Sequence, residues 1–157
     1  MTPPRLYVVL DRTASAGRDL DEILAAALDG GAEMIQLREK TCPSGTLFPL
    51  AQRLRARCRA AGVPFIVNDR VDLAVAVDAD GVHLGQDDLP PAAARALLKP
   101  GMILGLSTHS VEQAKAAQAA GADYVAVGSM FPTATKPEFQ LVGPALARRC
   151  GRSCASR

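Results

Sequence analysis

The feature that most constrains the fold of this chain is a repeated unit: a short apolar run typical of a strand, then an Ala- and Leu-rich stretch. Six such runs predict six strands, at residues 6–10, 34–37, 65–67, 81–84, 103–106 and 124–127. Helical spacing is clearest in the intervening stretches DLDEILAAALDGG, TLFPLAQRLRARCRAAG, PAAARALL and SVEQAKAAQAAG. Successive strands begin 16 to 31 residues apart, which is about what a strand, a loop, a helix and a turn require. The order predicts an α/β protein with a parallel sheet.

Glycine recurs at the junction between each predicted helix and the strand that follows it. It occurs in GGAEMIQL, AGVPFIV, DADGVHL, KPGMILGL and AGADYVAV. A glycine just past a helix end tolerates the left-handed backbone that turns the chain back toward the sheet. We therefore expect each helix to end at its junction glycine.

Two parallel α/β architectures fit such a repeat, a doubly wound sheet and a TIM barrel, and the polar residues help to separate them. Polar clusters follow five successive strands: residues 36–40, 68–70, 86–88, 107–109 and 133–136. A barrel brings all of its strand ends to one rim, whereas an open sheet concentrates its chemistry at a single switch point. The pattern favours a (β/α)8 barrel type of fold, of which about six of the eight units are present.

Composition and charge narrow the class of protein further. The chain of 157 residues is 48% hydrophobic, as expected for one domain with a sizeable core. Its net charge is +2, but the last ten residues hold four arginines and no acidic residue, so the body gives no support for nucleic-acid binding. Neither a secretory leader nor an apolar run long enough to span a membrane is visible. The four cysteines form no CxxC pair, which predicts incidental thiols and a cytoplasmic location.

Two carboxylates at neighbouring strand ends suggest a metal site. Asp69 follows the third predicted strand and Asp88 follows the fourth. On a barrel rim they can converge on one hard cation that keeps several waters, which suits Mg²⁺. A role as a helix N-cap or turn residue explains each aspartate about as well as a metal site does.

Cations at the same rim suggest a diphosphate. Arg38 and Lys40 lie just beyond the second strand, and Lys136 follows a Pro-flanked loop. An arginine fork and compact lysine charges suit the oxygens of a diphosphate, and with a metal they would neutralise it as a leaving group. Taken singly, each is more simply a surface charge. His83 and His109 are as well explained by core and loop positions, so neither is assigned a catalytic role.

The motifs LYVVLD, IQLREK, NDRVDLAVAVDADGVHLGQDDLP, ILGLSTHS, AGADYVAVGSMFPTATKP and VGP occur in the order seen in thiamine phosphate synthases, and the chain resembles that family over residues 5–147. The resemblance implies an enzyme that joins an aminopyrimidine diphosphate to a thiazole phosphate, releasing diphosphate, without an enzyme nucleophile. It implies Asp69 and Asp88 as Mg²⁺ ligands, and Arg38, Lys40, Ser107 and Lys136 as catalytic residues. The substrate-binding residues that it implies are Gln36, Leu37, Arg38, Glu39, Lys40, Asn68, Ser107, Thr133, Ala134, Thr135 and Lys136.

The sequence departs from the barrel pattern after residue 147. We expect an incomplete barrel domain over residues 1–147 and an atypical basic tail over 148–157, as in a truncated or out-of-frame reading. Unclosed barrel edges would favour self-association. Two alternatives to an active synthase stay open: a remnant that binds only Mg-diphosphate, and a paralogue similar to thiazole tautomerase, against which the complete LREK and NDR…GQDD motifs argue.

Overall fold

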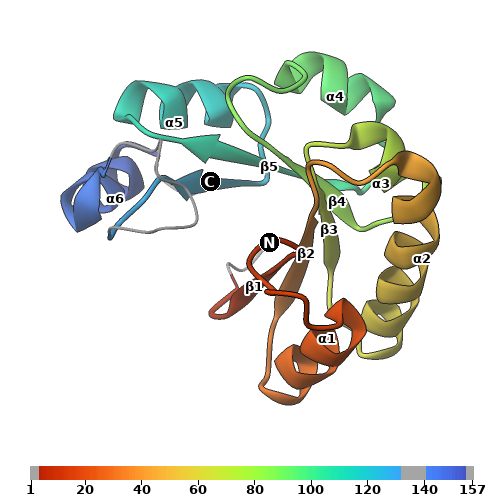
Figure 1. The fold of residues 1–157 in the computed structure, drawn as a ribbon. Coiled ribbons are helices and arrows are strands. Elements are labelled where there is room, and N and C mark those ends of the chain that lie inside the picture. The colour runs from red at the N-terminus through yellow and green to blue at the C-terminus, as the bar shows by residue number, and fades with distance from the viewer. Residues whose placement is uncertain (1–3, 132–140, 155–157) are drawn as a thin grey trace.

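The computed structural model describes residues 4–131 and 141–154, which form one curved parallel sheet with helices on its outer side (Figure 1). The strands are β1 (Tyr7–Asp11), β2 (Met34–Arg38), β3 (Phe65–Asn68), β4 (Gly81–Leu84), β5 (Ile103–Thr108) and β6 (Tyr124–Val127). The helices are α1 (Leu20–Asp29), α2 (Ser44–Ala60), α3 (Val71–Ala76), α4 (Pro91–Leu97), α5 (Val111–Ala119) and α6 (Gly143–Ser153). All six predicted strands are therefore confirmed.

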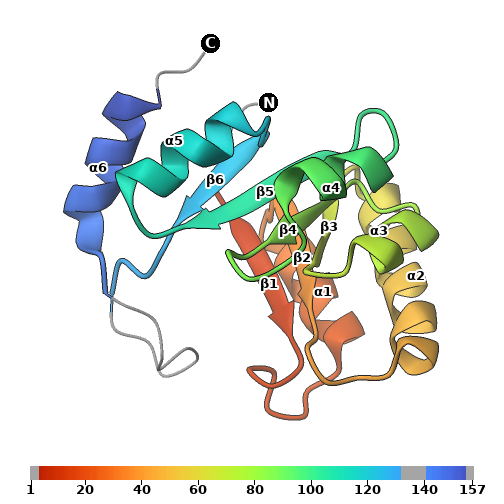
Figure 2. The same ribbon diagram turned by 90° about the horizontal axis from the view of Figure 1, so that it is seen from above.

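Each strand pairs in parallel with the next one along the chain, in the order β1-β2-β3-β4-β5-β6. No strand order reverses, so the described sheet has no switch point of the doubly wound kind. This order and the curvature of the sheet confirm the barrel type of fold. Viewed from above, β5, β6, α5 and α6 form an arm that extends from the part built by β1 to β4 (Figure 2).

The core lies between the sheet and the helices packed on its convex side. Ile35, Phe65 and Leu104 are fully buried strand residues, and Leu24 and Leu54 meet them from the helices. A second, smaller cluster joins α5 to α6 through Val111, Ala114 and Cys150. Because α6 packs against α5 and runs to Ser153, it continues across residue 147, and the division of the chain at that position stays a prediction.

The junctions confirm the glycine prediction at three places and correct it at two. Gly31, Gly62 and Gly121 have positive φ angles, and each lies just past a helix. Gly101 also has a positive φ angle, but α4 already ends at Leu97 and Leu98 is extended, so this glycine belongs to the turn before β5. Between α3 and β4, however, the left-handed residue is Asp78, with φ of 55°, and Gly81 lies within β4. A Cβ on Gly81 would overlap the backbone carbonyl of Ile103 on β5, so this glycine serves close strand approach rather than helix termination.

An acidic residue precedes every second strand and ties two β/α units together. Glu33 accepts from the Arg5 amide at 2.7 Å, Asp80 from the Phe65 amide at 2.7 Å, and Asp123 from the Leu104 amide at 2.8 Å. Each carboxylate also pairs with an arginine side chain: Arg5, Arg55 and Arg95 respectively. These three carboxylates lie at the amino ends of the strands, and we call them the floor carboxylates.

Candidate functional site

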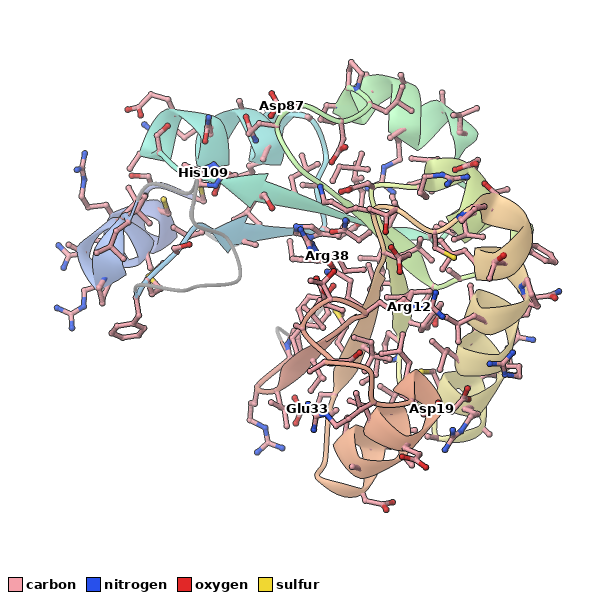
Figure 3. All side chains as sticks on the ribbon, in the orientation of Figure 1. Arg12, Asp19, Glu33, Arg38, Asp87 and His109 are labelled. Carbon is pink, nitrogen blue, oxygen red and sulfur yellow. The ribbon has the colours of Figure 1, made fainter. Side chains whose placement is uncertain are left out.

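The carboxyl ends of the strands surround a pocket of about 630 Å³ on the concave side of the sheet. In Figure 3, Arg38 lies near the centre of the molecule, between the loop that follows β1 and the arm that carries β5 and β6. The pocket is lined by most of the predicted site residues that the structure describes: Gln36, Arg38, Lys40, Asn68, Asp69, Asp88 and Ser107. Four strands, β2 to β5, therefore bring to one cavity residues that are up to 71 positions apart in the sequence.

Asp69 and Asp88 lie against one another in this pocket. The pKa of Asp88 is raised above its ordinary value, first by burial and then by its hydrogen bond with Asp69. Lys40 Nζ lies 3.1 Å from Asp69 Oδ2, and the Gly85 amide donates to Asp88 Oδ2 at 2.6 Å. Two carboxylates in contact favour a shared proton or a cation between them. The structure brings the two carboxylates together in one pocket, and their role as metal ligands stays a prediction.

The backbone of Asp69 is held in an unusual conformation. Its φ angle is 62°, a left-handed value that is uncommon outside glycine, asparagine and aspartate. The Asp69 amide donates to the His83 carbonyl at 2.8 Å, so the residue just beyond β3 remains tied to β4. Backbone strain of this kind is found at sites whose surroundings fix the geometry. Neither aspartate acts as a helix N-cap, because α3 begins after Arg70 and α4 after Pro90.

Asn68, the last residue of β3, carries an unsatisfied donor. Its side chain is 8% exposed, and Nδ2 has no hydrogen-bond partner among the residues that the structure describes. A buried amide N–H without an acceptor costs free energy, so such a group calls for an explanation. The amide lies in the wall of the pocket, where a ligand oxygen would satisfy it.

The residues after β2 have different surroundings. Arg38 pairs through Nη1 with Asp11 Oδ2, and its side chain is 19% exposed. Glu39 instead turns into its own loop: it accepts from the amides of Thr41 and Cys42, and its side chain is 6% exposed. These bonds, the Thr41 amide first, hold its pKa below the usual value despite burial. The Leu37 side chain belongs to the core. Direct substrate contact by Glu39 or Leu37 stays a prediction.

A chain of hydrogen bonds that the sequence did not predict crosses the bottom of the pocket. Gln36 Nε2 donates to the Tyr7 hydroxyl at 2.6 Å, and the Tyr7 and Tyr124 hydroxyls lie 2.9 Å apart. His83 then bridges Tyr124 and Ser107, with 2.9 Å from each ring nitrogen. Burial raises the pKa of both tyrosines, so both hydroxyls stay protonated. The sequence does not indicate Tyr7 and Tyr124 as site residues, because a tyrosine within a strand is equally typical of core packing.

The remaining predicted residues, Thr133, Ala134, Thr135 and Lys136, lie outside the described residues. Within residues 4–131 and 141–154, no group of three or more His, Cys, Asp or Glu side chains is placed to hold a metal ion. Three carboxylates, those of Asp69, Asp87 and Asp88, line the described part of the pocket, and Asp69 and Asp88 are the two that contact one another. In the same part of the chain, no helix is both long and apolar enough to cross a membrane.

Comparison with known proteins agrees with this geometry. The family described as thiamine monophosphate synthase matches residues 6–155. The chain belongs to this family. It is 53% identical over 133 residues to the thiamine-phosphate synthase of Roseiflexus sp. (strain RS-1), a match that covers 85% of this chain and 56% of that protein. It is 48% identical over 134 residues to the thiamine-phosphate synthase of Haloarcula marismortui, covering 85% of this chain and 64% of that one.

A solved structure gives the same result for the fold. The thiamine phosphate pyrophosphorylase of Pyrococcus furiosus superposes with a TM-score of 0.84 at 38% identity, over 94% of this chain and 69% of that one. The six β/α units therefore follow the TIM-barrel type of that family. The chain spans about 56% to 58% of the length of the two Roseiflexus synthases.

Proposed function

We propose that this chain carries the aminopyrimidine diphosphate half of a thiamine phosphate synthase site. The reaction is a transfer: 4-amino-2-methyl-5-(diphosphooxymethyl)pyrimidine and 4-methyl-5-(2-phosphooxyethyl)thiazole give thiamine phosphate and diphosphate. The observation that carries this proposal is the convergence of the Asp69–Asp88 pair and Lys40 beside the buried, unsatisfied Asn68 donor in one pocket. Such a set suits a substrate that brings both negative charge and hydrogen-bond acceptors.

Mg²⁺ is the cofactor that we propose, held by Asp69 and Asp88. The fit rests on the donors: two hard carboxylate oxygens in contact, whose mutual repulsion a divalent cation would relieve. Mg²⁺ typically takes one or two carboxylates and fills its other positions with water and phosphate oxygens. When bound, it would supply electrostatic stabilisation to the departing diphosphate.

The proposed roles of the side chains follow from their charges and places. Arg38 and Lys40 bind diphosphate oxygens and stabilise the charge that builds as the carbon–oxygen bond breaks. Asn68 donates from its buried amide, and Ser107, held by His83, offers its hydroxyl at the far wall. Lys136 completes the cationic set, and Thr133, Ala134 and Thr135 hold the thiazole phosphate. Orientation and charge neutralisation together require no enzyme nucleophile.

The test is Mg²⁺-dependent release of diphosphate when the purified chain is mixed with both substrates. Asp69→Asn and Asp88→Asn should each lower the rate by about a hundredfold or more, because each removes one of the two charged ligands that would hold Mg²⁺ beside the departing diphosphate. Asp72→Asn is the matched control, since Asp72 is a surface carboxylate of α3 that pairs with Arg70. A folded chain that releases no diphosphate would refute turnover. Tight binding of Mg-diphosphate without turnover would support the binding-only alternative.

We also propose that the chain self-associates through the outer edges of its sheet. Among the described strands, β1 pairs only with β2 and β6 only with β5, and Val9 on β1 is 46% exposed. Strand edges and apolar side chains of this kind favour pairing with another chain. Light scattering after size-exclusion chromatography should find an oligomer, and a stable compact monomer would refute the proposal.

The four free thiols suit the reducing cytoplasm, where we place the reaction.

A further inference from the structure

Asp11 is a buried carboxylate that touches the candidate site through another residue. It ends β1, as Arg38 ends β2, and the two Cα positions are partners in the strand register. The Asp11 side chain is 8% exposed and its Oδ2 pairs with Arg38 Nη1. The sequence assigned Asp11 no role, because an acidic residue after an apolar run resembles any strand end.

The Asp11 carboxylate is itself held in place by the backbone. Its Oδ1 accepts from the Ala14 amide at 3.0 Å, and its carbonyl accepts from the Ser15 amide at 2.8 Å. Burial alone would raise the pKa of Asp11, but the bonds from Ala14 and Arg38 outweigh it and hold the pKa below its usual value. The carboxylate is therefore a fixed, ionised anchor at the end of β1.

Arg38 needs such an anchor, because it lies between two cavities. It lines the 630 Å³ pocket and also an adjoining pocket of about 460 Å³ at the ends of β1 and β2, beside Arg12 and Lys40. An arginine side chain has several rotatable bonds, and ordering it on ligand binding weakens affinity. Asp11 engages Nη1, so the guanidinium keeps other donors for a ligand.

We infer that Asp11 is a positioning residue that holds the Arg38 guanidinium toward the diphosphate site before substrate binds. This inference deepens the proposed function and rests on it for the identity of the ligand. The inference also predicts whether removal of the Asp11 charge raises or lowers the affinity for an anion. Removing a negative charge next to an anion site should tighten anion binding if only net charge matters. Loss of positioning should weaken it.

Asp11→Asn is the discriminating variant, because an asparagine oxygen can still accept from the Ala14 amide while the charge that holds Arg38 is gone. Calorimetry would measure the affinity of inorganic diphosphate in the presence of excess Mg²⁺. We expect Asp11→Asn to weaken binding about tenfold, the effect of losing one charge-assisted contact. Asp123→Asn is the matched control: it removes the charge of a floor carboxylate from its arginine and should leave affinity unchanged.

A double-mutant cycle tests whether Asp11 acts through Arg38. Asp11→Asn combined with Arg38→Gln should bind no more weakly than Arg38→Gln alone. Additive losses, or an unchanged or tighter affinity for Asp11→Asn, would overturn the inference. If Asp11→Asn does not fold, Asp11→Glu replaces it, since the longer side chain keeps the charge but moves it, and the expected direction is the same.

A second measurement does not depend on any ligand. ¹⁵N relaxation of arginine Nε–Hε groups reports the order of the Arg38 side chain, with its signal assigned from Arg38→Gln. We expect a rigid group in the unmodified chain and a mobile one in Asp11→Asn. An equally rigid Arg38 in Asp11→Asn would refute the positioning role. If the unmodified chain does not bind Mg-diphosphate, the proposed function fails, and this measurement alone decides the role of Asp11.

Discussion

Asp80 should be one of the most sensitive positions for stability, although it lies at the opposite end of the sheet from the candidate site. Its Oδ2 accepts from the Phe65 amide at 2.7 Å and its Oδ1 lies 3.2 Å from Arg55 Nη2. Phe65 is fully buried, and the Arg55 side chain is only 10% exposed. Neither donor can easily turn to water, so Asp80→Ala leaves both with fewer partners.

The expected loss can be worked out contact by contact. A hydrogen bond to a charged acceptor contributes about 1.5–3 kcal/mol when its loss leaves a buried donor unsatisfied. The Arg55 pair adds about 0.5–1 kcal/mol, because the Asp80 side chain is 34% exposed and water screens it. Arg55 also keeps its bond to the Asp78 carbonyl at 2.7 Å, which limits the damage. Asp80→Ala should therefore lower the free energy of unfolding by about 3 kcal/mol.

Asp80→Asn is the control for this prediction, because it keeps an oxygen for the Phe65 amide and loses only the charge. It should cost about 1 kcal/mol. Urea unfolding followed by far-UV circular dichroism measures both variants, since the chain has no Trp to serve as a fluorescent probe. The dependence of the free energy of unfolding on urea concentration, the m value, should not change. A loss below about 1 kcal/mol for Asp80→Ala would refute the reasoning.

Three further predictions test other parts of the fold. Burial raises the pKa of the Cys58 thiol to about 11, so at pH 8 Ellman's reagent should modify Cys42 quickly and Cys58 only after unfolding; equal rates would contradict the packing of α2. Lys99 and then Arg59 lower the pKa of Asp78 from 3.8. The stability that ionised Asp78 contributes is therefore fully present above pH 3.8 and is lost as the pH falls through the lower pKa of the folded state. The free energy of unfolding of Asp78→Asn should fall less steeply in acid titration than that of the unmodified chain. Ser110→Ala removes the acceptor for the Gln113 amide at the start of α5 and should cost about 1 kcal/mol in urea unfolding, whereas Ser110→Asp should retain the cap.

Much of the sheet could be predicted from the sequence because its central strands, β2 to β4, are buried on both faces. A strand such as Phe65–Asn68 then appears as a short continuous apolar run, and its neighbours follow at regular spacing. The helix Val71–Ala76 was expected only from the alternating order of the units, because six residues carry too little periodicity to show helical spacing of their own. The reversal at Asp78 was missed because glycine is the usual residue there, whereas here a salt-bridged aspartate takes the left-handed conformation.

The candidate site likewise contains residues that the sequence predicts and residues that it does not. Residues just past the strands, such as Asp69 and Asp88, could be found because polar side chains stand out after apolar runs. Residues inside strands could not, because Tyr7 and Tyr124 have the same sequence pattern whether they pack in a core or join hydroxyls across a pocket. Their partnership needs β1 and β6 to face one another across the concave side, and that curvature is a property of the whole sheet.

The carboxylates at the two ends of the sheet show why the site belongs at the strand carboxyl ends. The floor carboxylates share one pattern of contacts. Asp80 and Asp123 each accept a hydrogen bond from one backbone amide and pair with one arginine, which balances the carboxylate charge. Asp69 and Asp88 face each other, and the pKa of Asp88 rises as a result of that contact and its burial. Lys40 pairs with Asp69 and the Gly85 amide donates to Asp88, but the two acids still contact one another and repel when both are ionised. A shared proton or a cation relieves that repulsion, and the Mg²⁺ that we propose would do so.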